Sequence, residues 1–395
     1  MLLSHPRMTT LTTIAVFFLL VGTFTSITVQ GGYLVFILIP LFFYTWRAKG
    51  RSFKLPASAW WLLGLTAVLS ASVFINWSEM PKPTTNLTRV KYYLIASLGI
   101  FPVGVWLKRV SDRTKKRLLM WFVIAFGIAA LYVVINYFFI GSGRRAMGSI
   151  MRYAYGTAYT LLLMIGMLLH RDHFKSWYDK KWAIAGIALG LVGLIFINQR
   201  GAQGSFFLGL PFVLWFYNRK IAATVFLICS LLGGFIAYNY FFGTQTDSKI
   251  RILNAKSNES DNIRREQWLS AFYAFKEKPV LGWGYGNFHS QNVRIKRDHG
   301  MKSLDFEGHA HNVPLEIAAG AGSLGLIFFF GFFFTWMWEC WKYGGVTRMI
   351  MVPFFLAIMF QAQFESILDA NNMAWMGFLY ALTMAQDKRY QIPFS

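Results

Sequence analysis

Apolar segments long enough to cross a lipid bilayer recur along the whole chain, and this feature limits the possible folds most strongly. A spanning helix needs about 20 apolar residues, and its backbone must satisfy its own hydrogen bonds within the lipid. The segments occupy residues 10–29, 32–46, 56–75, 91–107, 118–140, 153–169, 182–198, 203–217, 221–242, 313–338, 350–365 and 371–386. We therefore expect an all-α, polytopic integral membrane protein with about twelve transmembrane helices.

The composition leaves no room for a large soluble domain. Of the 395 residues, 55% are hydrophobic and 14% are charged, whereas soluble domains carry about 25% charged residues. We expect transmembrane helices 1–9 within residues 1–242, a long periplasmic loop at 243–312, and helices 10–12 within 313–395. The N-terminal segment reads as the first span rather than a removed signal peptide, because no clear cleavage site follows it.

The net charge of +22 is better explained by membrane topology than by nucleic-acid binding. Lysine and arginine collect in the cytoplasmic loops of membrane proteins. If both termini are cytoplasmic, the main basic clusters all lie on the cytoplasmic side, at residues 47–54, 108–117, 171–181, 219–220, 342–348 and 388–389. Cys229 and Cys340 lie in or beside apolar segments and indicate neither a disulfide framework nor a cysteine metal site.

Six arginines fall on the opposite, outward side: Arg144, Arg145, Arg152, Arg200, Arg264 and Arg265. A guanidinium group forms paired, charge-assisted hydrogen bonds with phosphate and diphosphate oxygens. Together these side chains could line a pocket for an anionic lipid. The alternative is that the loop arginines pair with loop acids or with phospholipid headgroups. Arg200 differs from the others, because apolar helix flanks it on both sides and charges at a membrane edge are usually functional.

The long outward loop contains two patterned stretches. Residues 263–276 have the period of an amphipathic helix with Trp268, Phe272 and Phe275 on one face, which favours an ordered lid over the membrane surface. Residues 277–288 contain alternating glycines. These glycines could form a backbone nest for phosphate oxygens, but a tight turn of glycine and aromatic residues is the favoured interpretation. Trp283 and Tyr285 could stack on sugar rings.

His311 stands where the polar loop enters the apolar helix that begins at 313. Histidine exchanges protons near neutral pH, so this position suits a general base. Asn312 is expected to cap the helix, and Pro314 suits its first turn. Small residues at 318, 321, 322 and 325 are spaced to form a smooth face for a neighbouring helix. The helix would then be a rigid mount for the imidazole.

A divalent-metal face is a weaker alternative in the same region. In an extended segment Asp305, Glu307, His309 and His311 would project to one side. Nothing in the sequence sets the geometry of such a site, so no metal is predicted.

The stretch His311-Asn312, nine residues, Gly322, two residues, Gly325 resembles the signature of the O-antigen ligase and O-antigen polymerase superfamily of bacterial membrane glycosyltransferases. Glu316 matches an acidic residue common there. The resemblance extends to Arg264, to the following Glu-x-Trp, and to the glycine turn at 279–288. Residues 199–202 resemble the Ser-Arg-Gly-Ala element of the superfamily, with Gln in place of Ser. The resemblance covers residues from about 196 to 338.

This resemblance implies transfer of a polysaccharide from an undecaprenyl-diphosphate carrier at the periplasmic face of a Gram-negative inner membrane. Ligases of the superfamily deliver it to lipid A–core oligosaccharide, and polymerases deliver it to another carrier-linked repeat unit. The resemblance also implies a fold related to the C-type glycosyltransferases and a reaction without metal or other cofactor. By position, Arg200 and Arg264 would hold the diphosphate, with Arg265 as an alternative to Arg264, and His311 would act as base. Direct displacement at the anomeric carbon would invert its configuration.

The leading hypothesis from the sequence is an O-antigen ligase, and the alternative is an O-antigen polymerase. A protein O-glycosyltransferase is less favoured, because those relatives tend to carry an additional C-terminal soluble portion. A transporter of lipid-linked sugars is the competing class. It would require charged residues within the spans, and only Arg200 approaches such a position.

Overall fold

The computed structural model describes residues 6–25, 55–98, 103–104, 106–107, 110–140, 149–197, 199–242, 259–304, 308–343, 345–365 and 370–386, and these contain helices but no strand. The α-helices are α1 (Pro6–Thr25), α4 (Ala57–Ile75), α5 (Pro83–Leu98), α7 (Asp112–Ile135), α8 (Ser149–Leu169), α9 (Lys180–Phe196), α10 (Arg200–Trp215), α11 (Arg219–Phe242), α12 (Glu259–Glu277), α13 (Phe288–Asp298), α14 (Val313–Tyr343), α15 (Gly345–Gln361) and α16 (Ala370–Gln386). Short helical turns occupy Trp77–Glu79 and Asn136–Ile140.

Each span expected within the described residues corresponds to a helix, whereas the span at 32–46 lies outside them. Among the described residues, three helical segments are long and apolar enough to cross a bilayer: Ala57–Ile75, Asp112–Phe139 and Val313–Lys342. The chain is therefore an integral, all-helical membrane protein, and the total of about twelve spans stays a prediction. Helix α5 begins at Pro83, earlier than the span expected at 91–107, because the polar turns of this helix precede its apolar part.

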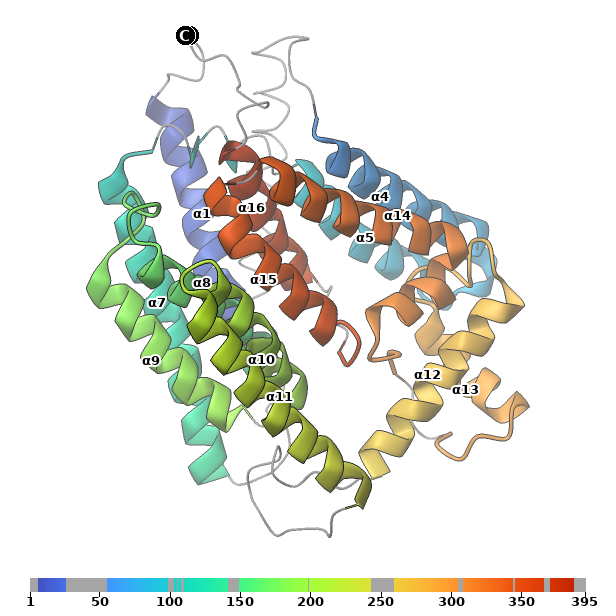
Figure 1. Cartoon of the computed structure of the whole chain (residues 1–395). Helices are drawn as coiled ribbons and strands as arrows, with labels where there is room; N and C mark the ends of the chain where they lie inside the picture. The colour runs from blue at the N-terminus through green and yellow to red at the C-terminus, as the bar shows by residue number, and fades with distance from the viewer. Residues whose placement is uncertain are drawn as a thin grey trace.

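The helices pack into a bundle (Figure 1), and glycines allow close contact between two of them. Helix α14 runs along α4, where a Cβ atom at Gly331 would lie 2.3 Å from the Trp61 ring and one at Gly64 would lie 2.1 Å from the Phe328 ring. These two glycines therefore let the aromatic rings of the neighbouring helix approach the backbone.

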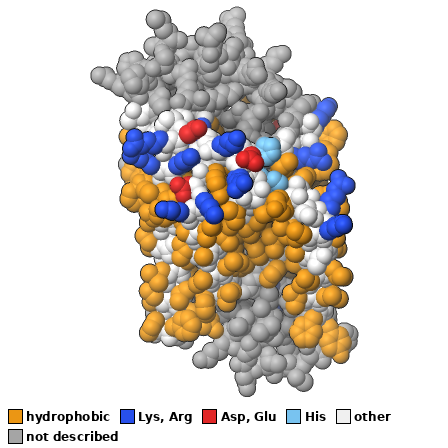
Figure 2. All heavy atoms as spheres, turned by 60° about the vertical axis from the view of Figure 1, so that its left-hand side comes forward, with side chains coloured by type: hydrophobic (Ala, Val, Ile, Leu, Met, Phe, Trp, Pro, Cys, Tyr) orange, Lys and Arg blue, Asp and Glu red, His pale blue; other side chains and the backbone are white. Residues whose placement is uncertain are grey.

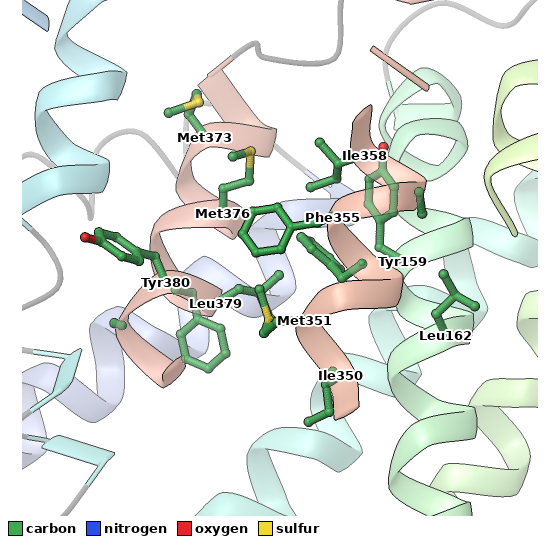
Figure 3. Close-up of a cluster of buried hydrophobic side chains, with 14 of the residues drawn as sticks. Tyr159, Leu162, Ile350, Met351, Phe355, Ile358, Met373, Met376, Leu379 and Tyr380 are labelled. Carbon is green, nitrogen blue, oxygen red and sulfur yellow. The ribbon is translucent and has the colours of Figure 1, made fainter. Parts of the chain in front are cut away.

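A second contact region joins α15 to α8, α10 and α16. Figure 3 shows Met351 and Phe355 of α15 on the side of α16, with Tyr159 and Leu162 of α8 beyond α15. All four side chains are buried. This packing fixes the position of the segment that follows α15, which carries part of the candidate site.

Basic side chains gather near one end of the bundle. Figure 2 shows a band of Lys and Arg next to this end, while the visible surface beyond the band is mainly apolar. The exposed members include Arg113, Lys116, Arg171, Lys175 and Lys181. We call this end the basic end. The sequence predicts that it faces the cytoplasm, and the opposite end carries the starts of α10 and α14.

Helices α12 and α13 form a small polar unit beside the start of α14. Helix α12 confirms the helix expected at 263–276. Small and polar residues make up the face that is fully buried in the protein. Gln267, Ser270, Ala271 and Ala274 are buried, whereas Phe272 is 43% exposed. The Ser270 hydroxyl lies 2.7 Å from the side-chain oxygen of Asn292 in α13. Small and hydrogen-bonded side chains therefore allow α12 to pack closely on its neighbours.

Helix α13 was not expected from the sequence. Its residues, FHSQNVRIKRD, are mostly polar or charged, so no apolar period marks them. Phe288, Asn292, Ile295 and Lys296 nevertheless fall three and four residues apart and are buried. The Lys296 ammonium donates to the Ser303 carbonyl at 3.1 Å. Its apolar residues are too few to form a recognisable run, and tertiary contacts such as this one complete its packing.

Candidate active site

The glycine turn at 279–287 docks on a break in α14. Gly322 has φ +67° and ψ −160°, so the helix is interrupted there and resumes beyond it. The amides of Trp283 and Gly284 donate to the carbonyls of Ala319 and Gly320, each at 2.9 Å. On the other side of the break, the Ser323 amide donates to the Pro279 carbonyl at 2.7 Å. The turn thus satisfies backbone groups that the break would leave unpaired.

This docking corrects the expected role of the small residues on α14. A Cβ atom at Gly322 would lie 2.3 Å from the Val280 carbonyl, and one at Gly282 would lie 2.5 Å from the Gly320 backbone. Gly322 therefore faces the glycine turn, not a neighbouring helix. The mount of His311 is the short helix from Val313 to the break, rather than one straight helix.

The tight-turn interpretation of 277–288 is confirmed, and the phosphate-nest alternative is wrong for residues 282–285. All four amides donate within the protein: Gly282 to Lys278, Trp283 and Gly284 to α14, and Tyr285 to the Ser72 hydroxyl. The Trp283 ring has the Lys278 ammonium at 4.0 Å and the Arg294 guanidinium at 4.9 Å from its centroid. Both cations therefore make cation–π contacts with this ring.

The backbone of His311 is held in an unusual conformation. Among the described residues it is the only non-glycine residue with positive φ, at 50°. Glu316 reaches back to accept the Ala310 amide at 2.7 Å, and its other oxygen lies 3.3 Å from His309 Nδ1. Left-handed backbone at a bulky residue is strained and persists only where surrounding contacts impose it.

On the C-terminal side of His311, Asn312 caps α14 as expected. Its side-chain oxygen accepts the Leu315 amide at 3.0 Å, and its side-chain nitrogen lies 3.2 Å from the Gln363 carbonyl. The Val313 amide donates to the Ala362 carbonyl at 2.7 Å. His311 is therefore fixed between Glu316 on one side and the segment after α15 on the other.

Glu365 joins two of the residues predicted from the sequence. This carboxylate, 1% exposed, follows α15. One of its oxygens accepts from Arg264 Nη2 at 2.8 Å, and the other lies 3.3 Å from His311 Nδ1. The Arg264 and His311 side chains are 21% and 29% exposed. A buried carboxylate bridging a partly exposed guanidinium and a partly exposed imidazole forms the centre of the candidate site.

The Glu365–His311 contact defines how the imidazole can react. The contact with Arg264 favours an ionised Glu365, which only accepts hydrogen bonds, so we assign the proton of the neutral imidazole to Nδ1. The neutral ring then has its lone pair on Nε2, which makes Nε2 the basic nitrogen. The same division of roles between a carboxylate, Nδ1 and Nε2 operates in serine hydrolases. The arrangement can therefore accept a proton at a defined atom.

Arg200 enters the same region through the start of α10. The residue is partly buried, and a Cβ atom at the next position, Gly201, would lie 3.8 Å from Glu365 Cγ and 3.7 Å from Gln361 Cγ. The first turn of α10 thus lies against the segment that carries Glu365. Two cationic residues, one imidazole and one carboxylate come from four separate parts of the chain to this end of the bundle.

Arg264 belongs to a group of three residues on α12 that each hold a different neighbour. Glu266 accepts the Lys302 and Ser303 amides at 3.2 and 2.7 Å, and hydrogen bonding from Ser303 lowers the pKa of Glu266. The Trp268 ring lies 6.3 Å from the Phe364 ring, next to Glu365. The Arg-x-Glu-x-Trp spacing therefore connects α12 both to the loop before His311 and to the segment after α15.

The other predicted residues are not part of this cluster as described. Arg265 is exposed on α12. Arg145 lies outside the described residues, as does Arg144, and the placement of the Arg152 side chain on α8 is not described. Asp305 and Glu307 of the metal alternative also lie outside them. His309 and His311 lie beside different carboxylates, Glu316 and Glu365, so the two imidazoles do not share an acidic partner.

Sequence reasoning missed Glu365 because it treated this residue as the end of an apolar span. The available signal was a carboxylate at the outward end of the expected helix 350–365, a position where membrane proteins place charges for a reason. Its partners could not be read from the sequence, because Arg264 and His311 are 101 and 54 residues away.

One comparison with known protein families matches the segment that carries most of this site. Residues 185–330 match the family model described as O-antigen ligase. These residues belong to the O-antigen ligase family. The matched segment contains Arg200, Arg264 and His311, the break in α14 and the glycine turn. No curated protein matches the chain.

The match to the O-antigen ligase model supports a ligase- or polymerase-type function of the glycosyltransferase kind. In general the family implies lipid-linked polysaccharide and lipid A–core as substrates. The matched residues end before Glu365, so the part that this carboxylate plays in the site comes from the structure alone.

Proposed function

We propose that the protein is an O-antigen ligase that transfers a polysaccharide from undecaprenyl diphosphate to lipid A–core at the periplasmic face of the inner membrane. The observation that carries the proposal is the Arg264–Glu365–His311 bridge at the end opposite the basic end. It pairs a guanidinium suited to a diphosphate with an oriented base, which are the two groups that this transfer needs.

The reaction would proceed as one displacement. The acceptor hydroxyl oxygen forms a bond to the anomeric carbon, and the bond from that carbon to the diphosphate oxygen breaks. The hydroxyl proton passes to His311 Nε2, and undecaprenyl diphosphate leaves with the electron pair. Attack opposite the leaving group inverts the anomeric configuration.

Arginine side chains would stabilise the leaving group. Negative charge develops on the diphosphate as the bond breaks, and preorganised cationic donors stabilise such charge strongly away from bulk water. Arg264 uses one donor for Glu365 and has further N–H groups for phosphate oxygens. Arg200, on the adjacent first turn of α10, would supply a second guanidinium, so the proposed reaction uses no metal. Arg145, Arg152 and Arg265 remain further candidates for binding the anionic lipid.

The decisive experiment uses purified full-length protein in proteoliposomes with carrier-linked polysaccharide and lipid A–core. We expect His311→Ala to reduce product formation by about 100-fold or more, because a positioned general base contributes about 10²–10⁴-fold. Wild-type activity should persist in the presence of a chelator. Full ligation activity of folded His311→Ala protein would overturn the assignment of the base. A wild-type protein that moves the carrier-linked polysaccharide across the membrane without forming product, equally well with His311→Ala, would be a transporter instead.

The polymerase alternative is tested in the same system. Carrier-linked single repeat units are supplied without lipid A–core, and the length of the carrier-linked glycan is measured. A ligase leaves these units at their original length and consumes them only when lipid A–core is added. Lengthening of the carrier-linked chain without lipid A–core would identify a polymerase instead.

A further inference from the structure

A cavity of about 230 Å³ lies inside the bundle at the basic end. It is bounded by the first turns of α7, the last turns of α8, the segment 173–177 that follows α8, and the second half of α16. Residues 200, 311 and 365 of the candidate active site lie at the opposite end of the bundle. The cavity is therefore a separate site, and its interpretation does not depend on the proposed function.

The lining favours a hydrocarbon chain. Twelve of the fifteen lining residues are apolar, among them Leu119, Leu163 and Leu382. Pockets that enclose whole drug-sized ligands measure about 300–1,000 Å³. A smaller apolar cavity suits a segment of one acyl chain better than a folded sugar or a nucleotide.

The polar part of the lining carries positive charge. Lys115, His173 and Ser176 are its polar members. The Lys115 side chain is only 12% exposed, and its ammonium lies 3.3 Å from a carboxylate oxygen of Asp112, which is 65% exposed. The contact between the ammonium and Asp112 is exposed, so the apolar stem of Lys115 borders the cavity while its ammonium lies at the exposed rim. A lipid phosphate at this rim would be within reach of the ammonium.

The surroundings of the cavity strengthen the preference for an anion. Exposed basic residues occupy the start of α7 and the turn after α8: Arg113, Lys116, Arg117, Arg171 and Lys175. Asp112 and Asp172 are the exposed acids in these two stretches, so positive charge predominates around the cavity. Juxtamembrane basic clusters attract anionic lipid headgroups.

We propose that this cavity binds one anionic phospholipid from the bilayer leaflet at the basic end. An acyl chain lies among the apolar side chains of α7, α8 and α16, and the phosphate lies against Lys115. The headgroup also contacts the exposed basic residues around it. The bound lipid would fill the space between α7, α8 and α16 and stabilise their packing.

Native mass spectrometry of the delipidated full-length protein tests this site. Phosphatidylglycerol and phosphatidylcholine with identical acyl chains are titrated separately, and inorganic phosphate is the headgroup control. We expect one saturable phosphatidylglycerol site, with binding at least about tenfold tighter than for phosphatidylcholine, and no comparable binding of phosphate. Undecaprenyl phosphate is titrated in the same way, and its tighter binding than phosphatidylglycerol would overturn the phospholipid assignment in favour of the carrier.

Two neighbouring lysines provide a matched pair of variants. Lys115→Gln should weaken phosphatidylglycerol binding about tenfold, which corresponds to about 1.4 kcal/mol, and Lys115→Arg should restore most of it. Lys116→Gln removes the same charge from the next, exposed position and should change binding less than about twofold. Equal effects of Lys115→Gln and Lys116→Gln would reduce the site to general surface attraction and refute the proposal.

A further variant tests the apolar part of the cavity. Leu163→Trp adds bulk to the lining while retaining Lys115, and should weaken binding about tenfold if an acyl chain occupies the space. Leu382→Trp, on a different helix, serves the same purpose if the first variant is unstable. Unchanged phosphatidylglycerol affinity in a folded variant of this kind would exclude the cavity as the binding site.

Discussion

Replacing Glu365 by glutamine tests the organisation of the candidate active site most directly. The carboxylate is 1% exposed and contacts Arg264 at 2.8 Å and His311 at 3.3 Å. A glutamine amide keeps the size but has one acceptor oxygen and one donor nitrogen. If the oxygen faces Arg264, the nitrogen faces His311 and favours the tautomer with its proton on Nε2. If the amide is reversed, its nitrogen meets the guanidinium.

Both stability and rate should respond, by different amounts. Breaking a fully buried ion pair costs about 3–5 kcal/mol. Because Arg264 and His311 are partly exposed, we expect Glu365→Gln to lower the free energy of unfolding by about 1–3 kcal/mol. The transfer rate should fall about 10²–10⁴-fold, since the base loses its reactive tautomer. This fall corresponds to about 2.7–5.4 kcal/mol of activation free energy.

The assay measures the initial rate of ligation in proteoliposomes together with the thermal unfolding midpoint. Glu339→Gln is a matched control, because Glu339 is also a buried carboxylate of the bundle, 4% exposed. It accepts from the Ala57 amide at 3.0 Å and from Ser58, at the far end of α14. This control should be destabilised but retain activity. A folded Glu365→Gln protein with more than about a third of the wild-type rate would refute the role of Glu365 in orienting the base.

Three further predictions follow from single residues. Gly322→Ala places a Cβ atom 2.3 Å from a carbonyl at a residue with φ +67°, and should lower the free energy of unfolding by about 2–4 kcal/mol. In the control Gly233→Ala the new Cβ atom meets no neighbour within 4 Å, so this variant should be neutral or stabilised by up to about 1 kcal/mol. Comparable unfolding midpoints of the two variants would contradict this prediction. Arg264→Gln should reduce the ligation rate about 100-fold, whereas Arg265→Gln, at an exposed position, should reduce it less than about threefold. A larger loss of initial rate in Arg265→Gln than in Arg264→Gln would assign the diphosphate contact to Arg265. The pKa of Glu266 is lowered from 4.5 in the folded protein, so its stabilisation of loop 301–304 is present at neutral pH and is lost as the pH falls from 4.5 through the lowered pKa. Amide hydrogen exchange of that loop should lose protection in this pH range, whereas the protection in Glu266→Gln should not depend on pH there.

The helices could be predicted well from the sequence because lipid imposes a simple rule on the backbone. Apolar runs of spanning length have few alternatives to a helix, and the expected spans at 56–75 and 371–386 agree closely with α4 and α16. Helix α13 escaped prediction for the opposite reason. It is polar, and its buried Lys296 and Asn292 depend on partners elsewhere in the chain.

The glycine positions were recognisable from the sequence, but their purpose was not. Spacing alone made Gly322 look like part of a smooth helix face. The structure pairs it with the turn at 279–287, where a broken helix and a glycine turn exchange backbone hydrogen bonds. Such pairing depends on how two irregular segments are placed relative to each other. Periodicity within either segment does not encode this placement.

The sequence by itself determined the membrane class of this protein, the ends of some helices, and the candidate residues Arg200, Arg264 and His311. Of the helix ends, only some agreed closely, as at α4 and α16, whereas others differed by four or more residues. The membrane class and the candidate residues could be read from the sequence because hydropathy and short motifs are local properties of a chain. Only the tertiary structure decided that Glu365 holds Arg264 and His311 together, and that Glu316 and Asn312 fix the strained backbone of that histidine. A carboxylate acquires such a role through distances of a few ångströms between distant parts of the chain, and these distances exist only after the helices have packed.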